Sequence, residues 1–472
     1  MRRLRTVTLA LLVIVPLLTG QAAAQPPTLP ALPFAGLPVP PSPAEASGTI
    51  LPGIQQWIDQ VIPPPPIGPA PRPAPPLEET NDLTPALAAL RQAVLPAPVG
   101  DPIFDLWPPN LADSSPGAVL EVRDITASAA PLVLVPIRQA VLFKYRTTDA
   151  HDRPSFATAT LVIPATGSPV PGARPVLVNN LPIDALGRRC TPSYTLAHGL
   201  SFESALTDFV PPTTQLAALR GYAVLIPDHE GPLMAYAEPY VAGHAVLDAV
   251  RAVRGWRAEE FGASRFAMTG YSGGAIATHG AAKLIESYAP DLAPALVGAA
   301  LGGVPADFEI LAGSMNANLA SGVFMAAVFG IARERPEILA RMNHLAQWVT
   351  TSPMKDQCIS VFALPGVLLL PIDIAANIAD PLRSTLARDI YEVTRMAGRA
   401  SATPLYIYNG EQEFWIPAAG ARNLYQEQCS LGVTAVYRSV LGEHIIAAGL
   451  GYPDAMIWLD ERLRGIPAHS EC

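Results

Sequence analysis

Apolar and polar residues alternate along the chain in short blocks that predict strands and helices in turn. The runs at 140–145 and 156–163 flank a turn rich in Asp, Arg and Pro, which predicts a β-hairpin. Further strand-like runs follow at 175–179, 222–226, 265–269, 296–301, 405–408 and 434–440. Residues 240–253 have the periodicity of an amphipathic helix. Strands that alternate with helices predict an α/β fold with a mostly parallel central sheet and helices on both faces.

The block from about 305 to 400 interrupts this alternation. It is mostly helix-forming and rich in apolar residues, among them Phe324, Met325, Phe329, Leu368 and Leu369. It is far longer than an ordinary loop between two strands. We interpret it as a helical cap inserted over an active site. The alternative is a set of extra core helices packed on the sheet.

The N-terminal 24 residues have the pattern of a signal peptide. A basic stretch ends at Arg5, an apolar run continues to Thr19, and Ala22 and Ala24 supply small residues before Gln25. The apolar run is short for a membrane span. We therefore predict export of the mature chain to a secreted location, with no stable insertion into the membrane.

A proline-rich segment follows, and 18 of the 53 residues from 25 to 77 are proline. Such a composition favours extended conformations and cannot bury a core. We predict a largely disordered spacer at 25–100, with short amphipathic pieces near 54–62 and 83–95. A cell-wall tether or a docking segment is the alternative. The catalytic domain is expected at 101–472.

Composition and charge narrow the classes of function. Half of the residues are hydrophobic and 15% are charged, which is enough apolar material for a large core. The formal net charge of −9 argues against a nucleic acid partner. No pattern of metal ligands or cofactor-binding residues is visible. In an exported protein, Cys190, Cys358, Cys429 and Cys472 predict two disulfides, and spacing leaves all three pairings open.

The clearest chemical signal is the G-x-S-x-G pattern of residues 270–274, centred on Ser272. It follows a predicted strand and opens a helix of small residues. This layout predicts a sharp strand-to-helix turn that exposes a nucleophilic serine. A glycine-rich packing turn is the alternative interpretation.

A serine hydroxyl needs a general base that is itself oriented by an acid. His444 follows the last predicted strand in a loop at its carboxyl end, which is where this base is expected. The loop after the preceding strand holds Glu411 and Glu413, and spacing does not choose between them. An oxyanion hole would use the N–H of Gly273. It would also use a donor from the loop at 181–186, either a protonated Asp184 carboxyl or the backbone N–H of Asp184.

Several motifs together resemble the secretory lipase family, the lipase A-like α/β-hydrolases of fungi and actinobacteria. The resemblance begins near Asp101 and leaves the proline-rich segment outside. It rests on residues 145–149 with Arg153-Pro154, on Cys190-Thr191-Pro192-Ser193-Tyr194, on 226–232, on 243–248 and on 270–274, in that order.

This resemblance implies an α/β-hydrolase fold with a lid built from the inserted block. It implies Ser272 as the nucleophile, His444 as the base and Asp184 as an oxyanion-hole residue. It also implies disulfides Cys190–Cys358 and Cys429–Cys472. Glu413 stands where the family usually places an aspartate, four residues before Pro417, so this chain departs from the family pattern in the acid.

The function expected from these residues and this resemblance is hydrolysis of carboxylic esters without a cofactor. A lipase, or an esterase for medium to long acyl chains, fits best, with a lipid or ester substrate and possible association with a lipid interface or the cell wall. One alternative is an acyltransferase acting on envelope lipids or sugars. Another is a catalytically weak, envelope-associated protein on a hydrolase scaffold.

Overall fold

The computed structural model of the chain describes residues 53–69, 83–168, 170, 172–201 and 212–472. The expected signal peptide and most of the proline-rich segment lie outside the described residues.

One mixed sheet organises the described chain, with strand order β1-β2-β3-β5-β4-β6-β7-β8-β9. The strands are β1 (Val119–Asp124), β2 (Ile137–Thr148), β3 (Pro154–Pro164), β4 (Val176–Asn180), β5 (Ala223–Pro227), β6 (Phe266–Tyr271), β7 (Leu296–Gly302), β8 (Leu405–Gly410) and β9 (Ala435–Val440). In this sheet order, the three pairs among β1, β2, β3 and β5 are antiparallel. The five pairs that follow, from β5-β4 to β8-β9, are parallel. The predicted mostly parallel sheet is confirmed, and each predicted strand lies within three residues of its expected position.

Strand β1 was not predicted. Its residues are only partly buried or exposed, because it is an edge strand that pairs with β2 alone. An edge strand with little burial has little hydrophobic signal in its sequence.

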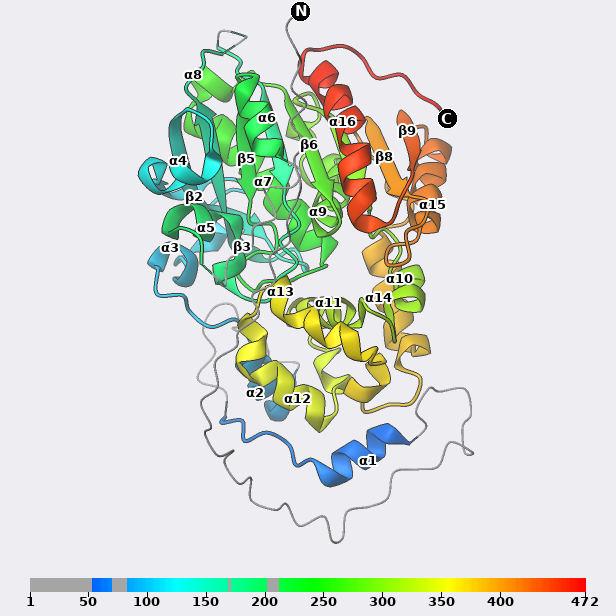
Figure 1. Cartoon of the computed structure of the whole chain (residues 1–472). Coiled ribbons are helices and arrows are strands. Elements are labelled where there is room, and N and C mark those ends of the chain that lie inside the picture. The colour runs from blue at the N-terminus through cyan, green and yellow to red at the C-terminus, as the bar shows by residue number, and fades with distance from the viewer. Residues whose placement is uncertain (1–52, 70–82, 169, 171, 202–211) are drawn as a thin grey trace, which may run out of the picture. The chain divides into compact units, whose positions relative to one another are not determined.

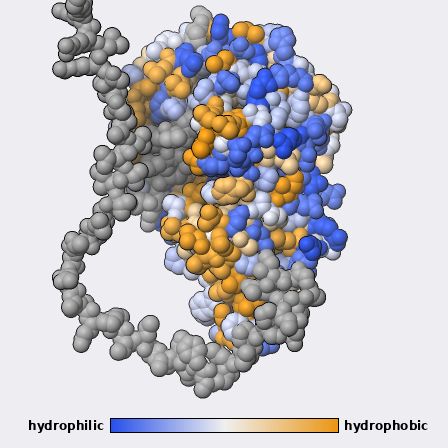
Figure 2. All heavy atoms as spheres, turned by 45° about the vertical axis from the view of Figure 1, so that its right-hand side comes forward, coloured by the Kyte–Doolittle hydropathy of each residue, from blue (hydrophilic) through white to orange (hydrophobic). Residues whose placement is uncertain are grey.

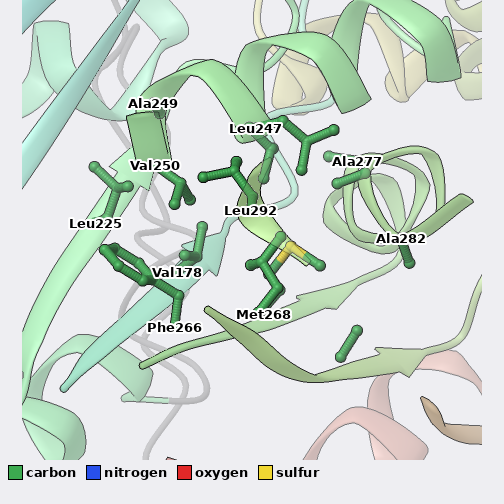
Figure 3. Close-up of a cluster of buried hydrophobic side chains, with 14 of the residues drawn as sticks. Val178, Leu225, Leu247, Ala249, Val250, Phe266, Met268, Ala277, Ala282 and Leu292 are labelled. Atoms are coloured by element: carbon green, nitrogen blue, oxygen red, sulfur yellow. The ribbon is translucent and has the colours of Figure 1, made fainter. Parts of the chain in front are cut away.

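Helices cover both faces of the sheet, as predicted (Figure 1). Helices α7 (Pro239–Trp256), α9 (Gly273–Tyr288) and α15 (Ala418–Ser430) pack on one face. On the other face lie α4 (Thr126–Val133), α5 (Pro192–His198), α6 (Thr213–Leu219) and α16 (His444–Leu463). Figure 3 shows part of the first interface, where Val178, Leu225 and Phe266 of the strands meet Val250 of α7. These side chains are fully buried, so the sheet is a rigid base for the loops at its strand ends.

The inserted block between β7 and β8 is helical and lies beyond one end of the sheet (Figure 1). Its main helices are α10 (Phe308–Met315), α11 (Ser321–Glu334), α12 (His344–Thr351), α13 (Ile359–Phe362) and α14 (Thr385–Arg395). They share one hydrophobic cluster with Leu90 and Val94 of α2 (Pro85–Val94) and Ile276 of α9, separate from the two clusters on the faces of the sheet. Phe324 and Phe329 are buried in that cluster, whereas Leu368 and Leu369 are exposed. The block is therefore a second layer over the sheet ends, which we call the cap.

Short helices also form in the N-terminal region, namely α1 (Ile54–Val61), α2 (Pro85–Val94) and α3 (Pro102–Asp105). Thr84 caps α2 through its side chain, and Pro85 occupies the first helical position, where a missing N–H costs nothing. Both α1 and α2 contact cap elements.

Two disulfides join Cys190 to Cys358 and Cys429 to Cys472. These are the pairings that the family resemblance implies. The first connects the loop after β4 to the cap, and the second fastens the C-terminal residue to α15. Figure 2 shows apolar residues in several patches among polar ones on the side of the molecule that carries α15 and β9.

Candidate active site

Ser272 lies in the turn between β6 and α9 with φ of 54° and ψ of −125°, a conformation that costs free energy for a residue with a side chain. The turn is tight because α9 packs close to the strand beside β6. A Cβ atom at Gly274 would overlap the carbonyl oxygen of Asn180, so only glycine fits there. The strained turn presents the Ser272 hydroxyl at the carboxyl end of the strand, toward the cap.

His444 is the first residue of α16, and its Nε2 lies 3.0 Å from Ser272 Oγ. The Glu443 side chain caps this helix by accepting from the N–H groups of Ile445 and Ile446. The Tyr271 hydroxyl donates to the His444 carbonyl at 2.5 Å. The imidazole is therefore positioned by hydrogen bonds both to the His444 backbone and to its ring.

Glu413 lies on the other side of the imidazole. Its Oε2 is 2.6 Å from His444 Nδ1, and its Oε1 accepts from the N–H groups of Trp415 and Ile416. Both oxygens of the carboxylate are thereby held by hydrogen bonds. Glu411, the other candidate acid, bonds instead to Ser439 and lies 3.7 Å from Arg422.

Asp184, in the loop after β4, faces Gly273 across the turn. A Cβ atom at Gly273 would overlap the Asp184 carboxyl, so the absence of a side chain at 273 makes room for it. Complete burial raises the pKa of Asp184 to about 7, even though the nearby His444 and a hydrogen bond from Tyr236 each lower it. Its Oδ1 has no hydrogen-bond partner within the described structure. A neutral Asp184 could thus donate from this position.

These groups open into a cavity of about 820 Å³ between the sheet and the cap. Ser272, Gly273, His444 and Asp184 line its base. The cap contributes apolar walls that include Phe324, Phe329, Leu345, Val349, Ile374 and Ile390. The cavity can accept a long apolar group whose polar end reaches Ser272.

The other histidines downstream of Ser272 lie apart from it. His279 is buried in α9, and burial lowers its pKa well below the usual value. His344 begins α12 in the cap, and His469 lies in the C-terminal tail. Among the described residues, no group of three or more His, Cys, Asp or Glu side chains is arranged to hold a metal ion.

Sequence reasoning missed two buried residues behind Asp184. Tyr236 hydrogen-bonds its carboxyl, and Glu230 accepts from the N–H of Ala185. Burial and the nearby Asp184 raise the pKa of Glu230 well above its usual value. Glu230 belongs to the motif at 226–232, but the motif alone gives no reason to connect it with the loop after β4.

The fold and this arrangement of Ser272, His444 and Glu413 define the class of α/β-hydrolases. Within that class the family is shown by sequence. A model of the secretory lipase family matches residues 206–471, more than half of the chain, so the chain belongs to the secretory lipase family.

Lipases and esterases are among its relatives. The chain is 29% identical to a trichothecene C-3 esterase of Fusarium sporotrichioides over 76% of this chain and 83% of the relative. It is 28% identical to a protein of Mycobacterium tuberculosis named a probable inactive lipase, over 78% of this chain and 83% of the relative. The structure of Candida antarctica lipase A in its closed state is similar, with TM-score 0.69 and 26% identity over 80% of this chain and 89% of that one.

Proposed function

We propose that this protein is an exported serine hydrolase of carboxylic esters, acting as a lipase or as an esterase for medium to long acyl chains. The observation that carries the proposal is the continuous hydrogen-bonded series from Ser272 through His444 to Glu413 at the base of an apolar cavity. In this series Glu413 can orient His444, and His444 can take the proton of Ser272.

In the proposed reaction, Ser272 Oγ attacks the ester carbonyl carbon while His444 Nε2 takes the hydroxyl proton. Glu413 accepts from His444 Nδ1–H, which fixes the tautomer with a free Nε2 and stabilises the imidazolium that forms. The imidazolium then protonates the leaving alcohol. Water, activated by the same imidazole, attacks the acyl-enzyme and releases the acid.

The negative charge on the tetrahedral intermediate needs donors that are already in position. The N–H of Gly273, the first residue of α9, lies at the helix N-terminus, where the helix dipole favours negative charge. A protonated Asp184 is proposed as the second donor. Since its pKa is about 7, the neutral form is well populated in neutral and acidic solution.

The composition of the cavity supports the acyl preference. Its walls are aromatic and aliphatic side chains of the cap, and these give an alkyl chain a dry surface to bury. Export is supported by two disulfides and by the secretory character of the family. Within the described ranges, no helix has the length and apolarity to cross a membrane.

Hydrolysis of p-nitrophenyl esters from acetyl to palmitoyl tests the proposal. We expect turnover to be highest with medium or long chains and to vanish in Ser272→Ala. Ser287→Ala is the matched control, because this serine is exposed on the same helix. A folded wild-type protein that cleaves no ester would overturn the proposal. Addition of an alcohol acceptor to the same assay separates acyl transfer from hydrolysis.

A further inference from the structure

Residues 53–69, which we call the N-terminal strap, lie against the cap. They comprise α1 and the extended chain that follows it. Asp59 Oδ1 accepts from the backbone N–H of His344 at 2.7 Å, and the His344 ring donates from Nδ1 to the Ile62 carbonyl at 2.7 Å. The Trp348 indole N–H donates to the Pro63 carbonyl at 2.8 Å. The strap is thus bonded along the outer side of α12.

The inner side of α12 forms part of the cavity wall. Leu345, Ala346 and Val349 line the cavity, whereas Trp348 does not. The short helix η10 (Ile372–Ala375) has the same double role, because it contacts α1 and contributes Ile372 and Ile374 to the cavity. On this side the cavity wall is a single layer of helices, and the strap lies directly behind it.

The strap also contributes buried apolar side chains to its contact with the cap. Ile58 of α1 is 2% exposed, and Ile67 packs on the hydrophobic cluster of the cap. The strap then passes alongside α2, where residues 65–69 border a groove of about 370 Å³ shared with Ala89, Ala93 and Trp348. Helix α2 itself is bonded to the cap, since Lys355 Nζ donates to the Ala93 carbonyl.

Helix α12 needs this support. It has eight residues, and an isolated helix of that length is not stable in water. Its position therefore depends on what it packs against, which includes α1 of the strap, α2 and η10 as well as the cavity. A cavity whose wall is fixed before substrate arrives binds an alkyl chain at a lower entropic cost.

We propose that the N-terminal strap is a specificity-determining element, which fixes α12 and η10 and so sets the selectivity of the cavity for long acyl chains. The inference rests on the proposed ester hydrolysis. The reacting groups Ser272, His444 and Glu413 come from the sheet domain and not from α12 or η10. Release of the strap therefore impairs long-chain substrates and spares esters too short to reach the wall.

The experiment compares two disrupting variants of the full chain with one control. Ile58→Asp places a charge in the buried contact, and Trp348→Phe removes the indole donor to Pro63. Gln60→Asp puts the same charge on the exposed side of α1. For each protein, kcat/KM is measured for acetyl, octanoyl and palmitoyl esters, together with hydrogen exchange of residues 343–351.

We expect Ile58→Asp to speed exchange in α12 and to lower palmitoyl kcat/KM by about tenfold or more, with acetyl kcat/KM within about twofold of wild type. Trp348→Phe should also speed exchange in α12 and lower palmitoyl kcat/KM, but by smaller amounts. Gln60→Asp should match wild type in both measurements. Retained acetyl turnover shows that a variant has folded.

Three results would overturn the inference. An unchanged chain-length profile despite faster exchange in α12 would show that the strap does not set selectivity. Unchanged exchange in both disrupting variants would show that it does not hold the wall. A wild-type chain that cleaves acetyl esters but no longer ones would overturn the inference and the proposed acyl preference but leave ester hydrolysis standing, whereas a chain that cleaves none would overturn the proposed hydrolysis as well.

Discussion

The carboxyl of Asp184 occupies the space that a side chain at Gly273 would need. This contact places a buried acid beside the backbone N–H that is proposed to bind the oxyanion. A negative charge at that point would oppose the charge that develops in the reaction, so the protonation state of Asp184 matters for turnover.

The pH dependence of hydrolysis should report this group. Because burial raises the pKa of Asp184 to about 7, the donor form is present below that pH and is lost above it. We expect kcat/KM to fall by up to tenfold per pH unit above about pH 7. Asp184→Asn keeps a neutral donor and should remove this alkaline decline. The same decline in both proteins would assign it to another group.

Loss of the oxyanion donor itself is a separate test. Asp184→Ala leaves only the Gly273 N–H, and removal of one oxyanion donor costs about 100-fold or more in kcat. Measured at pH 6, where Asp184 is mostly neutral, the loss should be larger than at pH 9. Little loss at either value would point to the backbone N–H of residue 184 as the donor, because Asp184→Ala keeps that group.

Two substitutions of Glu413 should separate the effect of its charge on turnover from the effect of its side-chain length. Glu413→Gln keeps the shape and removes the charge that orients His444, and we expect kcat to fall by about 10³-fold or more. Glu413→Asp keeps the charge but shortens the reach to Nδ1, and a misplacement of about 1 Å costs on the order of 100-fold. Glu411→Gln is the control and should retain activity, since its carboxylate bonds to Ser439. Activity lost in Glu411→Gln and kept in Glu413→Gln would reverse the assignment.

The stability of the cap should depend on Arg333. This fully buried guanidinium in α11 donates to five backbone carbonyls, those of Val94, Leu186, Leu233, Met234 and Lys355. Arg333→Met leaves these acceptors unpaired and should lower the free energy of unfolding by about 4 kcal/mol. Arg383→Met, at a side chain that is 79% exposed, should change it by less than about 0.5 kcal/mol. Urea denaturation under non-reducing conditions measures both.

The two disulfides should contribute different amounts to the stability of the fold. Cys190–Cys358 spans 168 residues and Cys429–Cys472 spans 43, so loop-closure entropy favours the first by about 1 kcal/mol. We expect the double Cys→Ser variant of the first pair to lose more stability in urea. It should also lose activity, because Leu186 of the Asp184 loop bonds to Gln357 beside Cys358. Equal losses for the two pairs would contradict this.

The parts of the fold that could be predicted are those whose signal is local. The strand before Ser272 and the small residues after it lie within one stretch of sequence, and His444 follows a strand in the same way. The acid could not be chosen from spacing, because Glu411 and Glu413 share one loop. What separates them is that the N–H groups of Trp415 and Ile416 hold the Glu413 carboxylate, and only the folded loop shows this.

Contacts between distant segments left no such signal. Nothing in residues 53–69 indicates that they lie on α12, because the hydrogen bonds join positions more than 280 residues apart. In the same way, Tyr236 and Glu230 meet the Asp184 loop only through the packing of the strands and the cap.

The strap also has a consequence for the order of assembly. Asp59 is made early in synthesis, yet its partner His344 follows 285 residues later. Chains fold from the N-terminus as they emerge, and distant contacts form slowly. The strap must therefore stay unattached until α12, which follows β7 in the chain, has been made, so the chamber for the acyl group cannot be completed before that point.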